Sequence, residues 1–407
     1  MQEYSYLSSS FWEWVNIHLG KDTSRLRLSS AKTPEIATNA AITQIECRKH
    51  FHKKFNKTLN RFPEFYFPSS LACEQATGDL IASYHTRFVT ESDILVDMTA
   101  GLGNDLLHLA AAVKKATGIE RNKDLTDALK YNANGLNINN LEVIDGDSRE
   151  LIKNITGTIL FVDPARRGAD GSRVFDLSQC EPDILAELST IQTNFNRLIV
   201  KASPMLDITR TISQLPSVTD IYLIGTKTEC KELVVLCDFK AKPINEPEIH
   251  AVTLSDEETP IEFVFTRTEE ANSEAIISDY APAVNDWLYI PYPSTMKALP
   301  TKLLSEKFKI AKFHSNTHLY FGCGAEKIEN FPGEILQIID VIPWQSKNLK
   351  RFKTRYPNVM VTVRNFGMTA EALKSKLGVK EGGNDRLRLF GVGLGSDHTD
   401  RILIVAK

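Results

Sequence analysis

Short apolar runs alternate with helix-like segments between Asp93 and about Phe239. The strand-like runs are Ile94–Asp97, Ala116–Glu120, Leu141–Ile144, Ile159–Val162, Leu198–Lys201, Asp220–Ile224 and Leu233–Cys237. Strands that alternate with crossover helices are typical of βαβ units, so this pattern predicts a parallel, doubly wound α/β sheet. Only residues 225–232 separate the last two runs. This is too short for a crossover helix, so we expect a closing hairpin with one antiparallel strand.

The segments on either side of this sheet have different patterns. Residues 1–90 carry apolar stripes at helical spacing and predict a helical N-terminal region. The polar, proline-containing stretch after residue 240 predicts a linker or exposed loop. Beyond it, mixed strand-like and helix-like runs predict α+β structure that is separate from the first sheet. We therefore divide the chain into residues 1–90, 91–240, 241–330 and 331–407, and a ferredoxin-like fold is one option for the third part.

Composition narrows the class of protein only a little. The chain has 407 residues, which suits two or three domains, and its net charge of −3 does not single out a nucleic-acid binder. Its 6 cysteines form no C-x-x-C pair and have no matching histidine spacing, so we predict no metal site and no disulfide framework. There is no basic N-terminal segment, and no apolar run reaches the ~18 residues of a membrane span. We expect a soluble, cytoplasmic protein without a membrane partner.

A glycine loop follows the first strand. Residues 98–105 include Gly101 and Gly103 and lead into a helical segment, where free backbone N–H groups can meet the polar end of a nucleotide-like ligand. The dinucleotide fingerprint needs a small residue where this chain has Leu106. Asp97 suits S-adenosylmethionine (SAM) better, because it can accept a hydrogen bond from the ammonium of that ligand or organise the loop. A plain βα turn, with glycines for geometry alone, is the alternative.

Acidic residues follow the second and third strands as well. Glu120 can accept hydrogen bonds from both ribose hydroxyls of a nucleoside, in dinucleotide and SAM folds alike. Asp147, in the run Asp145–Ser148, could accept from an adenine amino group. The same run is equally compatible with an ordinary turn.

The fourth strand leads into Asp163, Pro164 and Arg166. Ligands of open α/β sheets bind at the carboxyl ends of the strands, so we expect Asp163 beside the glycine loop. Proline fixes the turn, and Arg166 offers a rigid donor fork for a phosphate or carboxylate. The structural alternative is that Asp163 caps the next helix and the arginine is solvated. Lys201 and Ser203, after the fifth strand, are candidates for the rim of the site.

The order of these motifs resembles that of a class I SAM-dependent methyltransferase, from about Asp93 to Phe239. The whole chain resembles bacterial methyltransferases with a C-terminal THUMP-like domain, and Asn365–Thr369 and Glu381–Asp385 are its C-terminal marks. The resemblance implies a Rossmann-like seven-stranded sheet, SAM as the cofactor and RNA as the substrate. The oligomeric state is not predicted.

The resemblance also implies roles for single residues. It places the methionine end of SAM over Thr99–Gly103, the ribose on Glu120, the adenine near Asp147 and the acceptor near Asp163–Arg166. The expected catalytic residues are Asp163, Pro164 and Arg166. The expected cofactor-binding residues are Asp97, Thr99, Ala100, Gly101, Gly103, Asn104, Asp105, Glu120, Arg121, Asp147, Ser148 and Gln75.

Two departures from related families bear on the reaction. Arg166 stands where methyltransferases of exocyclic base nitrogens usually have an aromatic residue. The Asp-Pro-x-Arg form resembles RNA uracil C5-methyltransferases, but residues 201–203 lack the cysteine nucleophile that those enzymes need. We therefore expect direct methyl transfer.

Three hypotheses for function follow. The first is an RNA-directed methyltransferase, supported by basic residues in the final block: Lys347, Lys350, Arg351, Lys353, Arg355 and Arg364. The second is a methyltransferase for a protein or a small molecule. The third is a non-catalytic SAM- or RNA-binding scaffold.

Overall fold

The computed structural model describes residues 7–29, 38–166, 176–256, 258–322, 326–382, 386–394 and 400–407. The chain forms two compact units. One contains residues 1–221 and 232–245, and the other contains residues 222–231 and 246–407. None of the described helices is long and apolar enough to cross a membrane.

The first unit begins with the predicted helical region. Its helices are α1 (Ser9–His18), α2 (Thr23–Ser29), α3 (Thr38–Phe51), α4 (Asn56–Arg61), α5 (Ser70–Gln75) and α6 (Asp79–His85). Phe11 and Ile45 belong to an apolar cluster that also contains Ala128, from a helix of the following sheet domain. Asn132 of that same helix accepts a hydrogen bond from Tyr66 N–H at 2.7 Å. The helical region is therefore packed onto the sheet domain.

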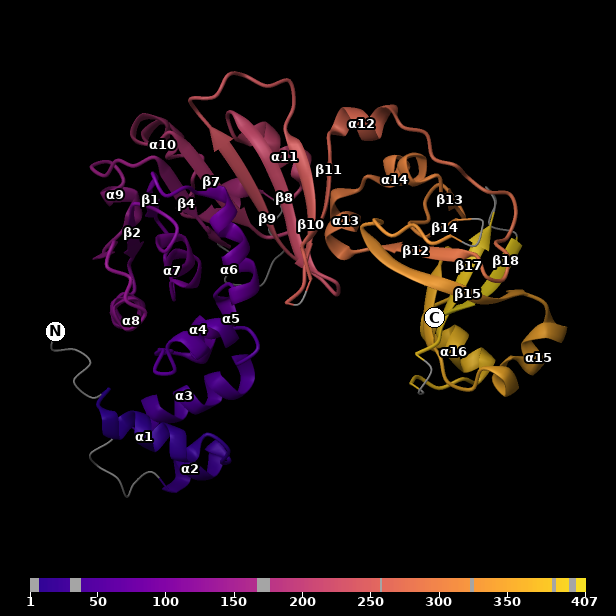
Figure 1. Ribbon diagram of the computed structural model, residues 1–407, viewed down its shortest axis with the longest axis horizontal. Helices are drawn as coiled ribbons and strands as arrows, with labels where there is room; N and C mark the ends of the chain where they lie inside the picture. Colours follow the sequence, from indigo (N-terminus) through magenta and orange to yellow (C-terminus); the bar gives the residue numbers. More distant parts are fainter. Residues whose placement is uncertain are drawn as a thin grey trace. The chain divides into compact units, whose positions relative to one another are not determined.

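The predicted α/β sheet follows, and Figure 1 shows its strands with the intervening helices. The strands are β1 (Ile94–Asp97), β2 (Lys115–Glu120), β3 (Leu141–Asp145), β4 (Ile159–Val162), β7 (Arg197–Ala202), β8 (Val218–Thr226) and β9 (Cys230–Asp238). The helices are α7 (Asn104–Ala110), α8 (Lys123–Gly135), α9 (Ser148–Leu151), α10 (Leu188–Asn194) and α11 (Ile208–Gln214).

The strand order in this part of the sheet is β8-β9-β7-β4-β1-β2-β3. The β1–β2, β1–β4, β2–β3 and β4–β7 pairs are parallel, whereas β7 and β9 are antiparallel. This confirms the parallel sheet with its closing hairpin. The carboxyl ends of β1, β4 and β7 are neighbours, so the residues that follow these strands lie at one edge.

The stretch after residue 240 is not only a linker, so that prediction was wrong. It contains β10 (Glu248–Leu254), which pairs with β11 (Ile261–Phe265), and the two continue the first sheet beyond β8 to give nine strands. The expectation that the second half is separate from the first sheet is therefore wrong for β10 and β11, whereas the strands from residue 287 onward do form a sheet of their own. Nearly all of β10 is buried, but polar and proline residues on both sides hide this strand in the sequence.

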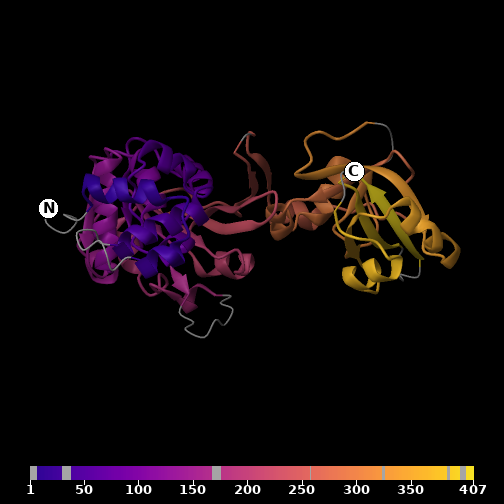
Figure 2. The same cartoon turned by 90° about the horizontal axis from the view of Figure 1, so that it is seen from below.

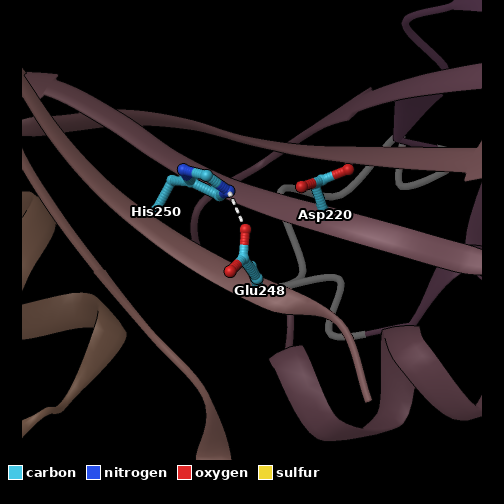
Figure 3. Close-up of side chains that lie close together, drawn as sticks. All are labelled: Asp220, Glu248 and His250. Carbon is cyan, nitrogen blue, oxygen red and sulfur yellow. Dashed lines mark ion pairs between the residues drawn. The ribbon is translucent and has the colours of Figure 1, made fainter. Parts of the chain in front are cut away.

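Polar contacts hold β10 to its neighbours. His250 Nδ1 lies 2.8 Å from Glu262 Oε1 of β11. Its Nε2 lies 3.9 Å from Glu248 Oε2, and Figure 3 shows this second pair. The imidazole is stacked on Tyr222 of β8, with 4.1 Å between ring centroids. These contacts fasten β10 to β11 and to β8.

The second unit contains a seven-stranded sheet of order β13-β14-β12-β15-β18-β17-β16. The strands are β12 (Trp287–Pro291), β13 (Ala311–Lys312), β14 (Tyr320–Gly322), β15 (Gly333–Pro343), β16 (Met360–Arg364), β17 (Arg388–Leu394) and β18 (Asp400–Ala406). The helices are α12 (Arg267–Asn272), α13 (Pro293–Ala298), α14 (Thr301–Phe308), α15 (Ser346–Arg355) and α16 (Ala370–Leu377).

Helices α15 and α16 lie along one face of this sheet (Figures 1 and 2). Phe352 of α15 and Leu373 of α16 share an apolar cluster with Leu403 of β18. Phe390 of β17 and Ile404 of β18 belong to a separate cluster with Leu288 of β12. The two clusters show that both faces of β17 and β18 are covered.

Candidate active site

The glycine loop after β1 is held by two carboxylates. Asp97 Oδ1 accepts a hydrogen bond from Thr99 N–H at 2.8 Å, and Glu120 Oε2 accepts one from Gly101 N–H at 2.9 Å. Gly101 and Gly103 have positive φ angles of 56° and 89°, a region that favours glycine. Asp97 therefore organises the loop, which was one of the two roles predicted for it.

The two glycines are needed for different reasons. A Cβ on Gly103 would lie 2.2 Å from Leu129 Cδ1, because α8 packs directly beneath the loop. A Cβ on Gly101 would meet nothing closer than Thr99 O at 3.8 Å. The crest of the loop is thus open for a ligand, whereas its second glycine is required for helix packing.

The predicted nucleoside-binding residues lie at neighbouring strand ends. Glu120 Oε1 accepts a hydrogen bond from Asn122 N–H at 2.7 Å, so both of its oxygens already contact backbone amides. Asp147 caps α9, which begins at Ser148, and pairs with Arg149 at 2.5 Å. Arg121 is exposed and pairs with Glu181 at 2.9 Å. Contact of these residues with a nucleoside remains a prediction.

Three of the predicted cofactor-binding residues lie on helices and not in the glycine loop. Asn104 and Asp105 are buried in the first turn of α7, and Gln75 is exposed at the end of α5. The Asn104 amide nitrogen donates to Thr77 O at 2.8 Å, while Asn104 Oδ1 has no hydrogen-bond partner within the described ranges. From the segment around Gln75, it is Thr77 that reaches the interior.

Asp163 lies beside the glycine loop, as predicted. Its backbone N–H donates to Thr99 Oγ1 at 2.7 Å, its carboxylate contacts Lys201, and its side chain is 39% exposed. The alternative of a helix cap is wrong, because β5 (Ala165–Arg166) follows and pairs with β6 (Cys180–Glu181). Pro164 is buried, and residues 167–175 lie outside the described ranges. Arg166 is therefore placed by its strand only.

A buried ion-pair network lies behind Asp163. We define it as Glu232 of β9, His85 of α6, Asp105, Lys201 of β7 and Asp163. His85 Nδ1 lies 2.8 Å from Asp105 Oδ1, and Nε2 contacts Glu232. Lys201 Nζ lies 3.1 Å from Asp105 Oδ2 and contacts Asp163 Oδ2. Charges alternate along the network from a fully buried end to the exposed carboxylate.

Burial and neighbouring charges shift the pKa values of this site. Burial raises the pKa of Asp97 to about 7, and the nearby carboxylates of Asp105 and Asp163 add to this shift. Burial alone would lower the pKa of His85, but Glu232 and Asp105 raise it to about 10. Burial likewise acts to lower the pKa of Lys201, but Asp105 and Asp163 raise it. Both cationic groups are charged at neutral pH.

Sequence reasoning missed much of this network. Lys201 was expected at the rim, but it is buried, and His85 and Glu232 were not identified as site residues. One local signal was available for Glu232, which is a charged residue at the start of the apolar run Leu233–Cys237. His85 gave no such signal, because its partners Asp105 and Glu232 are distant in sequence.

Two family models match the C-terminal part of the chain. Residues 287–332 match a ferredoxin-like domain, and residues 333–407 match a THUMP domain-like family. The β12–β15 pairing joins these two segments in one sheet. The ferredoxin-like match lies in the third part predicted from the sequence, except for its last two residues.

Curated relatives match about 30% of the chain. An uncharacterized RNA methyltransferase from Mycoplasma mobile is 31% identical over 127 residues, which are 30% of this chain and 35% of the relative. A 23S rRNA (uracil(1939)-C(5))-methyltransferase from Vesicomyosocius okutanii is 36% identical over 124 residues, which are 29% of this chain and 28% of the relative. The chain thus spans about a third or less of the length of these relatives.

A solved structure is similar along the whole chain. It is that of a candidate methyltransferase from Porphyromonas gingivalis, which has 27% sequence identity and a TM-score of 0.86. The similarity covers 100% of this chain and 99% of that protein. The chain therefore has the class I methyltransferase fold, preceded by a helical region and followed by a ferredoxin-like domain and a THUMP domain-like segment.

Proposed function

We propose that this protein is a SAM-dependent methyltransferase that transfers a methyl group directly to a nucleotide of RNA. The observation that carries the proposal is the position of Asp163. It is the exposed end of a buried ion-pair network and lies beside the open crest of a glycine loop, at the carboxyl ends of β4 and β1. The similar protein from Porphyromonas gingivalis and the relatives named as RNA methyltransferases support it.

The residues at the loop suit SAM chemically. SAM carries an ammonium and a sulfonium, and the carboxylate of Asp97 lies in the loop beside Thr99. Asn104 Oδ1, which has no hydrogen-bond partner among the described residues, adds a buried acceptor in the same region. Glu120 lies one strand away, where a ribose would bind in folds of this type. These groups would hold the ligand, which supplies an electrophilic methyl group.

Direct transfer needs no covalent bond between the protein and the substrate. The lone pair of the acceptor forms a bond to the methyl carbon, while the carbon–sulfur bond breaks and its electron pair stays on sulfur. The protein has to align these atoms and exclude water. Asp163 orients the acceptor through a hydrogen bond, and the acceptor's proton leaves to solvent.

The proposed RNA-binding part is the C-terminal unit. Helix α15 contains five basic and no acidic residues. Lys347 and Arg351 are one turn apart on this helix and line a groove beside β15. Positive charge of this kind suits the phosphates of RNA. An RNA substrate also fits the cytoplasmic location expected from the sequence.

Labelled SAM tests the proposal. The full-length protein is incubated with methyl-labelled SAM and a fractionated extract from cells that lack its gene. We expect label in RNA, removable by ribonuclease, and no transfer by Asp163→Asn although SAM still binds. Asp127→Asn, which removes a pair with Lys123 on α8, is the matched control. Label in protein or small molecules, or binding without transfer, would support the second or third hypothesis instead.

A further inference from the structure

Lys201 has no donor left for a substrate. Its ammonium contacts Thr77 Oγ1 at 2.9 Å, Asp105 Oδ2 at 3.1 Å, and Asp163 Oδ2. An ammonium group has three N–H donors, so these partners occupy all of them. The side chain is also buried, which keeps water from competing for the donors. Lys201 is therefore fixed by its protein neighbours and fixes them in turn.

The far end of the network holds Asp105 in place. His85 is completely buried and has a carboxylate at each ring nitrogen, so both nitrogens donate and the ring is an imidazolium. Burial would raise the pKa of Asp105, but Lys201 and His85 hold it well below its ordinary value. Asp105 is thus an anion between two cations. A buried charge pair of this kind has little freedom to rearrange.

Only one oxygen of the network remains available to a ligand. Asp163 Oδ2 contacts Lys201, whereas Asp163 Oδ1 makes no hydrogen bond to any residue that the structure describes. The backbone N–H of Asp163 is bonded to Thr99 Oγ1, so the main chain and the side chain are both held. With 39% of this side chain exposed, Oδ1 can meet an acceptor group at the glycine loop.

We propose that Lys201 is a positioning residue, which holds the Asp163 carboxylate ionised and with Oδ1 directed to the acceptor. This rests on the proposed methyltransferase function. An ionised Oδ1 selects an acceptor that carries a proton on nitrogen or oxygen, because such a group can donate to it. A pyrimidine ring carbon has no polar proton and gains nothing from this arrangement. The proposed acceptor is therefore a nitrogen or oxygen atom that carries a proton, and not a ring carbon.

The charges around Asp163 make its ionisation, and with it the proposed role of Lys201, dependent on pH. Burial raises the pKa of Asp163, and Lys201 opposes that shift. Among the described residues, the carboxylates of Asp105 of α7 and Glu232 of β9 act in the same direction as burial, and Asp97 of β1 also lies near Asp163. The His85 imidazolium contacts Asp105 and Glu232. Removal of Lys201 takes away the cation that contacts Asp163, so the pKa of Asp163 must rise and its ionised fraction at a given pH must fall.

The first test needs no substrate. Full-length protein labelled with ¹⁵N-histidine is titrated by NMR, and His85 is assigned by comparison with His85→Gln. We expect both ring nitrogens of His85 to stay protonated at pH 8, as its position between two carboxylates requires. A neutral His85 at that pH would overturn the network of alternating charges on which the inference depends.

The second test compares Lys201→Met with Lys115→Met, which removes an exposed pair with Glu142. Transfer to total RNA from gene-deleted cells is measured with saturating SAM between pH 5.5 and 8. We expect Lys201→Met to be roughly 10²-fold slower at pH 6 and to recover as pH rises, with SAM binding retained. Lys115→Met should match the wild type. An unchanged rate and pH profile in Lys201→Met would overturn the positioning role.

Further measurements separate this inference from the proposed function. Methylated nucleosides from the digested RNA should carry the methyl group on nitrogen or oxygen, and a C-methyl product would overturn the acceptor class. If the wild type methylates no RNA, the proposed function is wrong. The ¹³C carboxyl titration of Asp163 then decides the inference, because it must move to higher pH in Lys201→Met. Lys201→Arg, which keeps the charge, should keep the wild-type titration if Lys201→Met does not fold.

Discussion

His85 Nδ1 lies 2.8 Å from Asp105 Oδ1, and this buried contact joins α6, which precedes the sheet, to α7, which follows the glycine loop. The residues are 20 positions apart in sequence. Through this contact the helical N-terminal region becomes a part of the candidate active site. Several measurable properties depend on it.

Loss of the Asp105 carboxylate should strongly destabilise the fold. Asp105→Ala would leave the Lys201 ammonium and the His85 imidazolium buried without their shared anion, and breaking a buried pair in this way costs about 3–5 kcal/mol. Urea denaturation measures the free energy of unfolding. Glu142→Ala, which breaks an exposed pair with Lys115, should change it by only about 0–1 kcal/mol. Similar losses in the two variants would contradict the view that Asp105 neutralises the site.

The affinity for SAM should depend on pH through Asp97. Its pKa is raised to about 7, and a cationic ligand prefers the ionised carboxylate. Binding should therefore tighten as pH rises from 5.5 to 7, by about 15-fold if only the ionised form binds. Calorimetry measures this range, which lies below the ordinary pKa of an α-amino group. Asp97→Asn should bind SAM weakly and without this pH dependence. A wild-type affinity that falls with pH would refute the assignment.

The two loop glycines should differ in their tolerance of alanine. Gly103→Ala places a Cβ against Leu129 and at a positive φ, so overpacking of about 1–3 kcal/mol adds to backbone strain. Gly101→Ala has open space around it and meets only the strain, which is about 1–2 kcal/mol. Urea denaturation of both variants provides the comparison. Equal destabilisation would mean that α8 moves away from the loop at little cost.

The basic face of α15 should contribute to RNA binding through charge. Lys347→Ala together with Arg351→Ala removes two candidate phosphate contacts, so the slope of log K against log salt should become shallower by about 1.4 for single-stranded RNA. Filter binding of total RNA at several salt concentrations measures the slope. Lys374→Ala, on α16 and paired with Glu381, is the control and should leave the slope unchanged. An unaltered slope in the double variant would remove α15 from the RNA-binding surface.

Local patterns in the sequence were enough to find the loop and the strand ends. Asp97, Gly101 and Asp163 each follow an apolar run, and parallel strands bring their carboxyl ends to one edge of the sheet. The contact between Lys201 and Thr77 could not be found in this way, since the two residues are 124 positions apart and no short-range pattern links them. For β10 the difficulty was different. The polar and proline residues on either side of β10 led to the prediction of a linker, and the strand pairs with β8 and β11 only in the folded chain.

The continuation of the first sheet into β10 and β11 sets a limit on how the protein can be divided. A truncated form that ended near residue 240 would leave the hydrogen-bonding edge of β8 bare, and an uncovered edge strand is a template for aggregation. The same cut would remove His250, against which Tyr222 is stacked. An isolated catalytic fragment that is to remain monomeric must therefore extend at least to Phe265, the last residue of β11.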